Sequence, residues 1–335
     1  MALSLLETFR TLAAFSPPRG SLKDAPWETY VDWAIGQGLA PLASYNLEYR
    51  LMGADAPEWA RDRLLSVYQG SVNDNVMKLV NFKRSVTDLQ GRKIVVLGGA
   101  AFADSLYPHI AFRPVLDIQL LLAPQDLEGL TGFLGQSEFK TAPVLAEQTG
   151  ATRVLNDGRT PVLLHTSLLG KGYEAPERAL FERAAPMRVY GPSLYRLELE
   201  DAVVAQCLEH AEAGYNVPML SFVDLRELIL GAPHVSGPYS RQVDSGKIQE
   251  RAKLWRMERA LYTSLGIVEG LFPETREVVQ SLKPPLRRAS RELLDRLVVG
   301  PVTQLKAVRP KRGAERLRRL LAGGRQVLRP LESTS

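Results

Sequence analysis

The sequence predicts an α/β (α+β) protein, in which a small mixed sheet has helical flanks on its N- and C-terminal sides. A continuous run of β-branched and apolar residues at 93–97 ends at Gly98-Gly99 and is followed at once by an Ala-rich stretch. This order is typical of a buried strand, a tight turn and a helix. Apolar runs at 117–122 and 162–165 predict two further strands. Outside this centre, apolar residues recur at helical spacing.

Changes in this pattern along the chain divide it into four regions. We expect an N-terminal helical region at 1–90, an αβ core at 91–198, a C-terminal helical region at 199–300 and a basic tail at 301–335. In the third region, apolar periodicity predicts helices, and a stretch rich in Gly, Ser and Pro predicts an exposed loop. The helices are expected at 200–212, 222–230, 253–265 and 287–297, and the loop at 234–247.

Composition excludes several classes of protein. The chain has 335 residues, of which 45% are hydrophobic and 24% are charged, as in ordinary globular proteins. It lacks a run of about 18 apolar residues, so no transmembrane segment is expected, and the N-terminal stretch is typical of a short amphipathic helix rather than a signal peptide. The single cysteine, Cys207, excludes an internal disulfide and a cysteine-based zinc cluster. We therefore expect a cytoplasmic protein.

The net charge of +5 is concentrated in the tail at 301–335. This segment holds nine Lys or Arg and two Glu, a net charge of +7, and Leu317, Leu320 and Leu321 lie at helical spacing among its arginines. A cationic amphipathic helix can bind an anionic membrane surface or an acidic protein, here through residues 310–330. Nucleic acid is a less favoured partner, because no aromatic residue for base stacking follows Phe272. A helix packed on the body with a solvated charged rim is the structural alternative.

The tail interpretation predicts a salt-dependent attachment. Deleting 310–335 should leave the body folded and abolish binding to anionic liposomes or an acidic partner, because five of the seven net positive charges of the tail are lost. Added salt should reproduce the effect in the intact protein, as measured by co-sedimentation. Early melting of the truncated protein, or binding that persists unchanged in high salt, would contradict this interpretation.

Short motifs of the core occur in a fixed order. They read Leu97-Gly98-Gly99-Ala100-Ala101, Leu106-Tyr107-Pro108, Arg113, Asp117-Ile118-Gln119 and Val162-Leu163-Leu164-His165. The order resembles the nucleotidyltransferase superfamily, with its Gly-Gly turn, its Asp-x-Asp strand and a third acid on a neighbouring strand. It is most similar to the bacterial family of uncharacterised nucleotidyltransferases, which show Lys-Gly-Ala-Ala, Leu-Tyr-Pro, Arg, Asp-x-Asp and Glu-x-His. The resemblance covers roughly residues 27–230.

This resemblance implies a small mixed sheet of nucleotidyltransferase type, with ATP or another NTP as ligand and Mg²⁺ as metal. Asp117 would be a catalytic and metal-binding carboxylate, and Gly98, Gly99 and Arg113 would bind the nucleotide. The chemistry has a clear basis. Alternate residues of a strand face the same way, so acids at i and i+2 can share Mg²⁺ ions, which prefer carboxylate oxygens. A Gly-Gly turn lets backbone N–H groups approach a phosphate at a helix N-terminus.

Three positions depart from the family pattern. Gln119 stands in place of the second acid, Leu164 stands at the position of the third, and Gly98 replaces the Lys before the first glycine. With Asp117 as the one carboxylate left, two Mg²⁺ ions bridging a triphosphate would be under-coordinated. Two of the three expected carboxylates are thus absent, which leaves open whether the protein is an enzyme.

Every candidate residue also has a structural interpretation. Gly98-Gly99 can form a simple tight turn, Asp117 can bond a neighbouring backbone N–H, and Arg113 can be a surface charge. For the remaining polar residues, the structural role is favoured. His165 is expected to pack on its strand, His210 to make a structural hydrogen bond, and Asp224 to cap or pair within the helical half. A Rossmann fold is rejected, because the Gly-x-Gly-x-x-Gly pattern is absent.

These observations favour one function over two alternatives. The favoured function is that of a catalytically degenerate nucleotidyltransferase-like protein, which acts by binding a nucleotide or a protein partner. The first alternative is an active metal-dependent enzyme that transfers a nucleotidyl group to a hydroxyl, with Asp117 and further acids. The second is a non-catalytic scaffold that uses the basic tail to bind a membrane or a partner.

Overall fold

The computed structural model describes residues 3–15, 22–49, 55–89, 91–143, 151–187, 193–232 and 239–295. The basic tail lies outside the described residues. The chain forms two units, which are described separately below. The first joins Met1–Ala202 to Gly231–Gln242, and the second joins Val203–Leu230 to Val243–Ser335.

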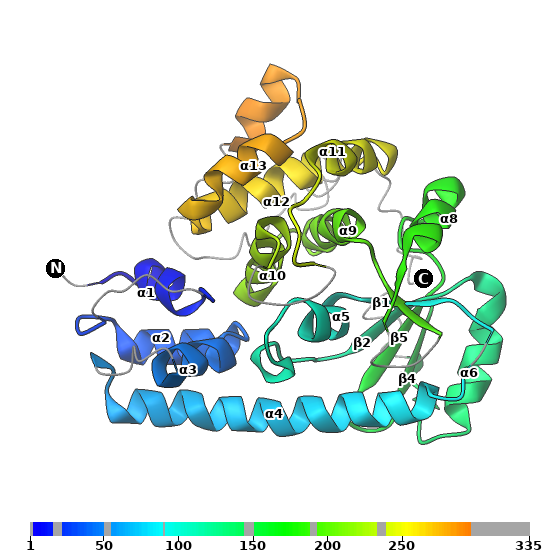
Figure 1. Ribbon diagram of the computed structural model, residues 1–335, viewed down its shortest axis with the longest axis horizontal. Helices are drawn as coiled ribbons and strands as arrows, with labels where there is room; N and C mark the ends of the chain where they lie inside the picture. Colours follow the sequence, from blue (N-terminus) through cyan, green and yellow to red (C-terminus); the bar gives the residue numbers. More distant parts are fainter. Residues whose placement is uncertain are drawn as a thin grey trace, which may run out of the picture. The chain divides into compact units, whose positions relative to one another are not determined.

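The first unit begins with four helices: α1 (Leu5–Leu12), α2 (Trp27–Gly36), α3 (Ala40–Tyr49) and α4 (Glu58–Val86). Helix α1 starts at a capping box, in which Ser4 and Glu7 satisfy each other's backbone N–H groups. Helix α4 follows Pro57, which cannot donate a hydrogen bond and therefore suits a helix start. Figure 1 shows α4, in cyan, running along α2 and α3 and continuing along the sheet.

Seven strands form one mixed sheet in the order β3-β4-β5-β2-β1-β7-β6. Strand β1 is antiparallel to β2 and parallel to β7, and β2 is parallel to β5. Strand β4 pairs antiparallel with β5. The strands are β1 (Ile94–Leu97), β2 (Ile118–Leu121), β3 (Lys140–Thr141), β4 (Arg153–Asn156), β5 (Pro161–His165), β6 (Ala185–Pro186) and β7 (Leu194–Arg196).

Helices and short 3₁₀ turns connect these strands. Helix α5 (Gly98–Ser105) follows β1 directly, as predicted, and the turn η2 (Ile110–Phe112) leads from it to β2. After β2 come the turn η3 (Pro124–Asp126) and α6 (Leu127–Gly135), and α8 (Glu174–Arg183) precedes β6. The sequence predicted α5 but not α8.

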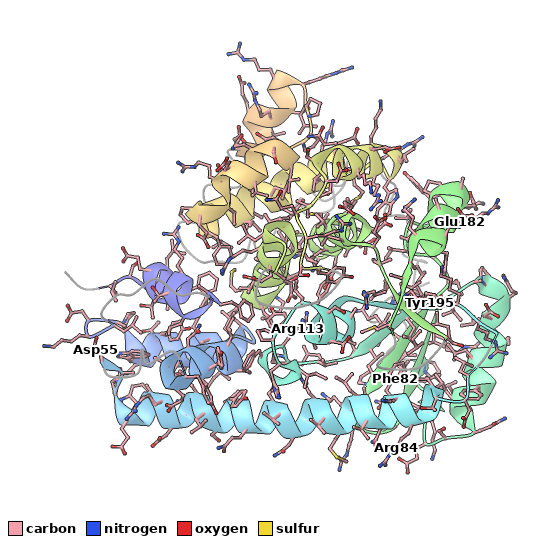
Figure 2. The ribbon with its side chains drawn as sticks, viewed as in Figure 1. Asp55, Phe82, Arg84, Arg113, Glu182 and Tyr195 are labelled. Atoms are coloured by element: carbon pink, nitrogen blue, oxygen red, sulfur yellow. The ribbon has the colours of Figure 1, made fainter. Side chains whose placement is uncertain are left out.

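One face of the sheet carries the main hydrophobic core. Alternate strand residues, among them Val96, Leu120 and Leu164, pack against Leu79, Phe82 and Val86 of α4, the alanines of α5, and Leu130 and Leu134 of α6. Phe82 projects from α4 toward the sheet (Figure 2). Because side chains alternate along a strand, Leu97, Gln119 and Leu163 face the opposite side. That opposite face holds the candidate site.

The second unit is helical. It holds the part of α9 (Leu199–Glu212) from Val203 onward, then α10 (Met219–Leu230), α11 (Ser245–Leu254), α12 (Glu258–Leu271), the turn η4 (Pro273–Thr275) and α13 (Arg276–Leu282). Residues 288–295 are also helical.

Two predictions for this region were wrong. The loop expected at 234–247 ends early, because Asp244 caps α11 by accepting a hydrogen bond from the Lys247 N–H. The helix expected at 253–265 is broken, because α11 ends at Leu254 and Arg256 takes a left-handed conformation with φ of 54° before α12 begins.

The structure confirms the predicted fold class, an α/β (α+β) arrangement with a mixed sheet and flanking helices. Among the described residues, no helix combines the length and apolar character needed to cross a membrane.

Candidate functional site

The register of the central strands brings the predicted motifs to one edge of the sheet. Strand β1 is antiparallel to β2, with Leu97 opposite Gln119, so the end of β1 adjoins the start of β2. Gly98 and Gly99 follow Leu97, and Asp117 directly precedes β2. The glycine turn, Asp117 and Gln119 therefore lie together.

The two glycines have different physical roles. Gly98 has a φ of +51° with open space around its Cα, so it is glycine because of its backbone conformation. Gly99 has no such constraint, but the guanidinium of Arg113 covers it. A Cβ at Gly99 would lie 2.9 Å from Arg113 Cζ. The missing side chain thus lets Arg113 rest on the first turn of α5.

This placement makes the glycine turn electropositive. The first N–H groups of a helix lack intrahelical acceptors, and the helix dipole adds partial positive charge there. A cation at a helix N-terminus is unfavourable by itself, yet Arg113 lies beside this one, in the segment that joins α5 to β2 (Figure 2). Backbone N–H groups and a guanidinium are together the donors that recognise phosphate oxygens.

Asp117 and Gln119 contact each other directly. The Gln119 Nε2 donates a hydrogen bond to Asp117 Oδ1 at 3.2 Å, so the amide occupies an oxygen that a metal would need. Burial raises the pKa of Asp117, and this effect exceeds the opposing effects of the Gln119 hydrogen bond and of the positive charges of Arg113 and Lys78. The Gln119 amide thus stands where the family pattern has a second carboxylate.

The expected position of the third acid was wrong by one residue. Strand β5 is parallel to β2 with Leu163, not Leu164, opposite Gln119. Leu164 lies opposite Leu120, is fully buried and belongs to the core on the other face. Leu163 is therefore the residue beside Gln119, and it is equally unable to ligate a metal. Since Val162, Leu163 and Leu164 are all apolar, the sequence carried no alternation that would reveal the face.

These residues do not fit the two Mg²⁺ ions that the resemblance implies. Mg²⁺ requires several oxygen ligands in near-octahedral geometry, usually from carboxylates and phosphates. Here one carboxylate, Asp117, accepts a hydrogen bond from the Gln119 amide, and the residue opposite Gln119 on β5 is Leu163. In the part of the chain that the structure describes, no group of three His, Cys, Asp or Glu residues is arranged to hold a metal ion.

Sequence reasoning missed the polar face of α4 that holds the Arg113 segment. Asn75 Nδ2 donates to the carbonyls of Ile110 and Arg113 at 2.7 and 2.8 Å, and Asn75 Oδ1 accepts from the Val115 N–H at 2.9 Å. Lys78 Nζ donates to the Val115 carbonyl at 2.9 Å. The signal available was the helical spacing of these polar residues, which alone does not identify the loop they bind.

The two candidate histidines lie away from this site or are inaccessible. His165 lies opposite Leu121, one full strand repeat beyond Leu163. In the second unit, His210 is fully buried, and its Nε2 lies 2.8 Å from Ser221 Oγ. Burial lowers the pKa of His210 to about 3, so the ring is neutral at physiological pH. The predicted structural hydrogen bond of His210 is thereby confirmed. Asp224 is fully buried in α10, close to Glu227.

A strand, a Gly-Gly turn and a helix, beside a strand that begins directly after an aspartate, are the arrangement expected of the nucleotidyltransferase class of fold. The family model described as "Uncharacterised nucleotidyltransferase" matches residues 23–273. This match covers well over half of the chain, so the chain belongs to the family of uncharacterised nucleotidyltransferases. The comparison with curated proteins found no match, and the comparison with solved structures found none either.

The raised pKa of Asp117 predicts a pH-dependent stability. Ionisation of this carboxyl costs folding free energy, and the cost is absent below the ordinary pKa of about 4 and complete above the raised pKa. Asp117→Asn should therefore raise Tm at pH 7, with a difference that disappears below about pH 4.

Glu128 provides a control of opposite sign. Its hydrogen bonds from Arg153 lower its pKa, so its contribution to stability is present at neutral pH and is lost as the pH falls. Glu128→Gln should accordingly lower Tm slightly at pH 7 and leave it unchanged in acid. A fall in Tm at pH 7 for Asp117→Asn would show that the carboxylate stabilises the fold.

Proposed function

We propose that this protein is a nucleotidyltransferase-like nucleotide-binding protein that holds the phosphates of ATP or another NTP and does not catalyse nucleotidyl transfer. One observation carries the proposal. The Gln119 amide donates a hydrogen bond to Asp117, and Leu163 lies opposite Gln119 on the neighbouring strand β5. The donors for a phosphate are retained at this edge, whereas the ligands for catalytic metals are not.

The phosphate-binding part has three components. Gly98 gives the turn its left-handed conformation, and Gly99 leaves room for Arg113 at the N-terminus of α5. The N–H groups of the first turn and the Arg113 guanidinium then converge on the same space. An anion placed there gains hydrogen bonds from both and a favourable interaction with the helix dipole.

The charge balance also favours an anion. Arg113 and Lys78 both act on Asp117, so two cations surround one carboxylate. Asp74 pairs with Lys78 at 2.6 Å, but its side chain is 55% exposed and its charge is screened by solvent. The nucleotide phosphates would therefore meet a site with an excess of positive charge.

Calorimetric titration with ATP in EDTA tests this function. Wild-type protein should bind one ATP, and Arg113→Met should weaken binding by about 10- to 100-fold, the value of one or two charge-assisted hydrogen bonds. The matched control is Arg153→Met, because Arg153 is an arginine of β4 that pairs with Glu128 instead. No ATP binding by the wild type would refute the proposal. Transfer of label from α-labelled ATP to an acceptor hydroxyl would show that an active transferase is the better description.

A further inference from the structure

Helix α4 contacts the segment that carries Arg113 and Asp117 through one polar face. Ser71, Asn75 and Lys78 lie at i, i+4 and i+7, which places them on the same side of the helix. Ser71 Oγ donates to the Ala111 carbonyl at 3.1 Å, and Asn75 and Lys78 bond the backbone from Ile110 to Val115. A helix from the N-terminal part of the chain thus satisfies backbone groups of a loop some 40 residues further on.

Asn75 has the geometry of a residue that fixes Arg113. It is buried, and both ends of its amide are bonded. The Nδ2 donates to the carbonyls of Ile110 and Arg113, and the Oδ1 accepts from the Val115 N–H. These bonds set the backbone of the loop where the guanidinium begins. Aspartate or alanine at this position would lose the two donated bonds and leave buried carbonyls unsatisfied.

Lys78 has the chemistry of a second phosphate ligand. Lysine is seldom buried, yet Lys78 is 8% exposed and its Nζ is held by the Val115 carbonyl and by Asp74. These two oxygens account for two of its three N–H donors. Among the described residues, the third has no assigned acceptor. Val115 lies between Arg113 and Asp117 in the chain, so the ammonium is bonded to the loop that carries both candidate residues.

We propose that Lys78 is a phosphate-binding residue of the site and that Asn75 is its positioning residue, so that α4 supplies the second cation for the phosphates of a bound nucleoside triphosphate. This inference rests on the proposed function. A lysine with a purely structural role would bond Val115 and Asp74 just as well, but it would contribute nothing to nucleotide affinity or to its salt dependence.

The test for Lys78 uses ATP as the probe, in EDTA, at several salt concentrations. Lys78→Met keeps the length of the side chain and removes the charge, and it should weaken ATP binding by about 10- to 100-fold and flatten the salt dependence. Lys78→Arg should recover part of the affinity. Lys83→Met is the matched control, because Lys83 is an exposed lysine of the same helix and should bind ATP as the wild type does.

The same titration tests Asn75. Asn75→Ala should weaken ATP binding and make Arg113→Met less damaging than in the wild type, because Arg113 is already misplaced. Asn81→Ala, on the same helix, should leave the affinity unchanged. Circular dichroism of each variant separates loss of binding from loss of folding. Wild-type affinity and an unchanged salt slope in folded Lys78→Met would overturn the inference while leaving the proposed function intact. Absence of ATP binding by the wild type would instead refute the proposed function.

Discussion

Leu164→Glu is expected to prevent stable folding, whereas Gln119→Asp combined with Leu163→Glu is expected to give a folded protein that binds Mg²⁺. Leu164 is fully buried in the core shared with α4 and α6, where a carboxylate finds no partner. Burying an unpaired charge or a neutral acid there should cost several kcal/mol, on the order of the total stability of many domains. Leu163 is also buried, in a smaller apolar cluster with Ala151 and Val154, but it faces Gln119, so the new acids would stand beside Asp117.

Thermal melting measures both outcomes. In the double variant, three neighbouring carboxylates repel one another, so Tm should fall without metal and recover by several degrees in millimolar Mg²⁺. Wild-type Tm should not respond to Mg²⁺. If Leu164→Glu folds normally and gains Mg²⁺ affinity while the Leu163 variant does not, the register between β2 and β5 is different from the one described here.

Gly99→Ala is expected to reduce ATP binding strongly with little loss of stability. The new methyl group would displace the far end of the flexible Arg113 side chain, not the backbone, and alanine favours the helix by about 1 kcal/mol over glycine. Displacing the guanidinium should weaken binding by about 10- to 100-fold, as for Arg113→Met. In an Arg113→Met background, Gly99→Ala should then have little further effect.

Gly98→Ala separates the conformation of the turn from the placement of Arg113. Its φ of +51° should make alanine cost about 1–2 kcal/mol of stability, but a Cβ there meets open space and leaves Arg113 in place. Calorimetry should therefore show the larger loss of ATP affinity for Gly99→Ala, and thermal melting should show the larger fall in Tm for Gly98→Ala. Wild-type ATP affinity in Gly99→Ala would show that Arg113 does not bind the nucleotide from the position that it occupies over Gly99.

Local patterns were sufficient to predict the centre of the fold. The apolar run that ends at Gly98-Gly99 predicted β1 and the start of α5, and the strand after Asp117 was also placed correctly. Strand β7 was missed because it has three residues, and its pairing with β1 spans about a hundred residues. Such a pairing depends on the fold and leaves little trace in local sequence.

The candidate site was predictable in its residues but not in its geometry. Gly98, Gly99, Arg113 and Asp117 do lie at one edge of the sheet, yet the covering of Gly99 by Arg113 is a contact between two separate turns. The confusion of Leu163 with Leu164 has another origin. In the family's Glu-x-His motif the acid lies two residues before the histidine, which is Leu163 here, and the pairing with β2 places that leucine opposite Gln119. Lys78 and Asn75 were beyond prediction, since the backbone groups that they bond lie 37 and 38 residues further along the chain, after β1 and α5.

The Mg²⁺ dependence of ATP affinity tests the central claim most directly, that protein cations and not metal ions hold the phosphates. Free ATP carries more negative charge than its Mg²⁺ complex, so a site built on Arg113 and Lys78 should bind ATP as tightly in EDTA as in Mg²⁺, or more tightly. Calorimetric Kd values should accordingly differ by less than about 10-fold between the two conditions. A tightening of about 100-fold on adding Mg²⁺, equal to about 2.7 kcal/mol, would contradict the account and show that Asp117 and further oxygen ligands hold a metal.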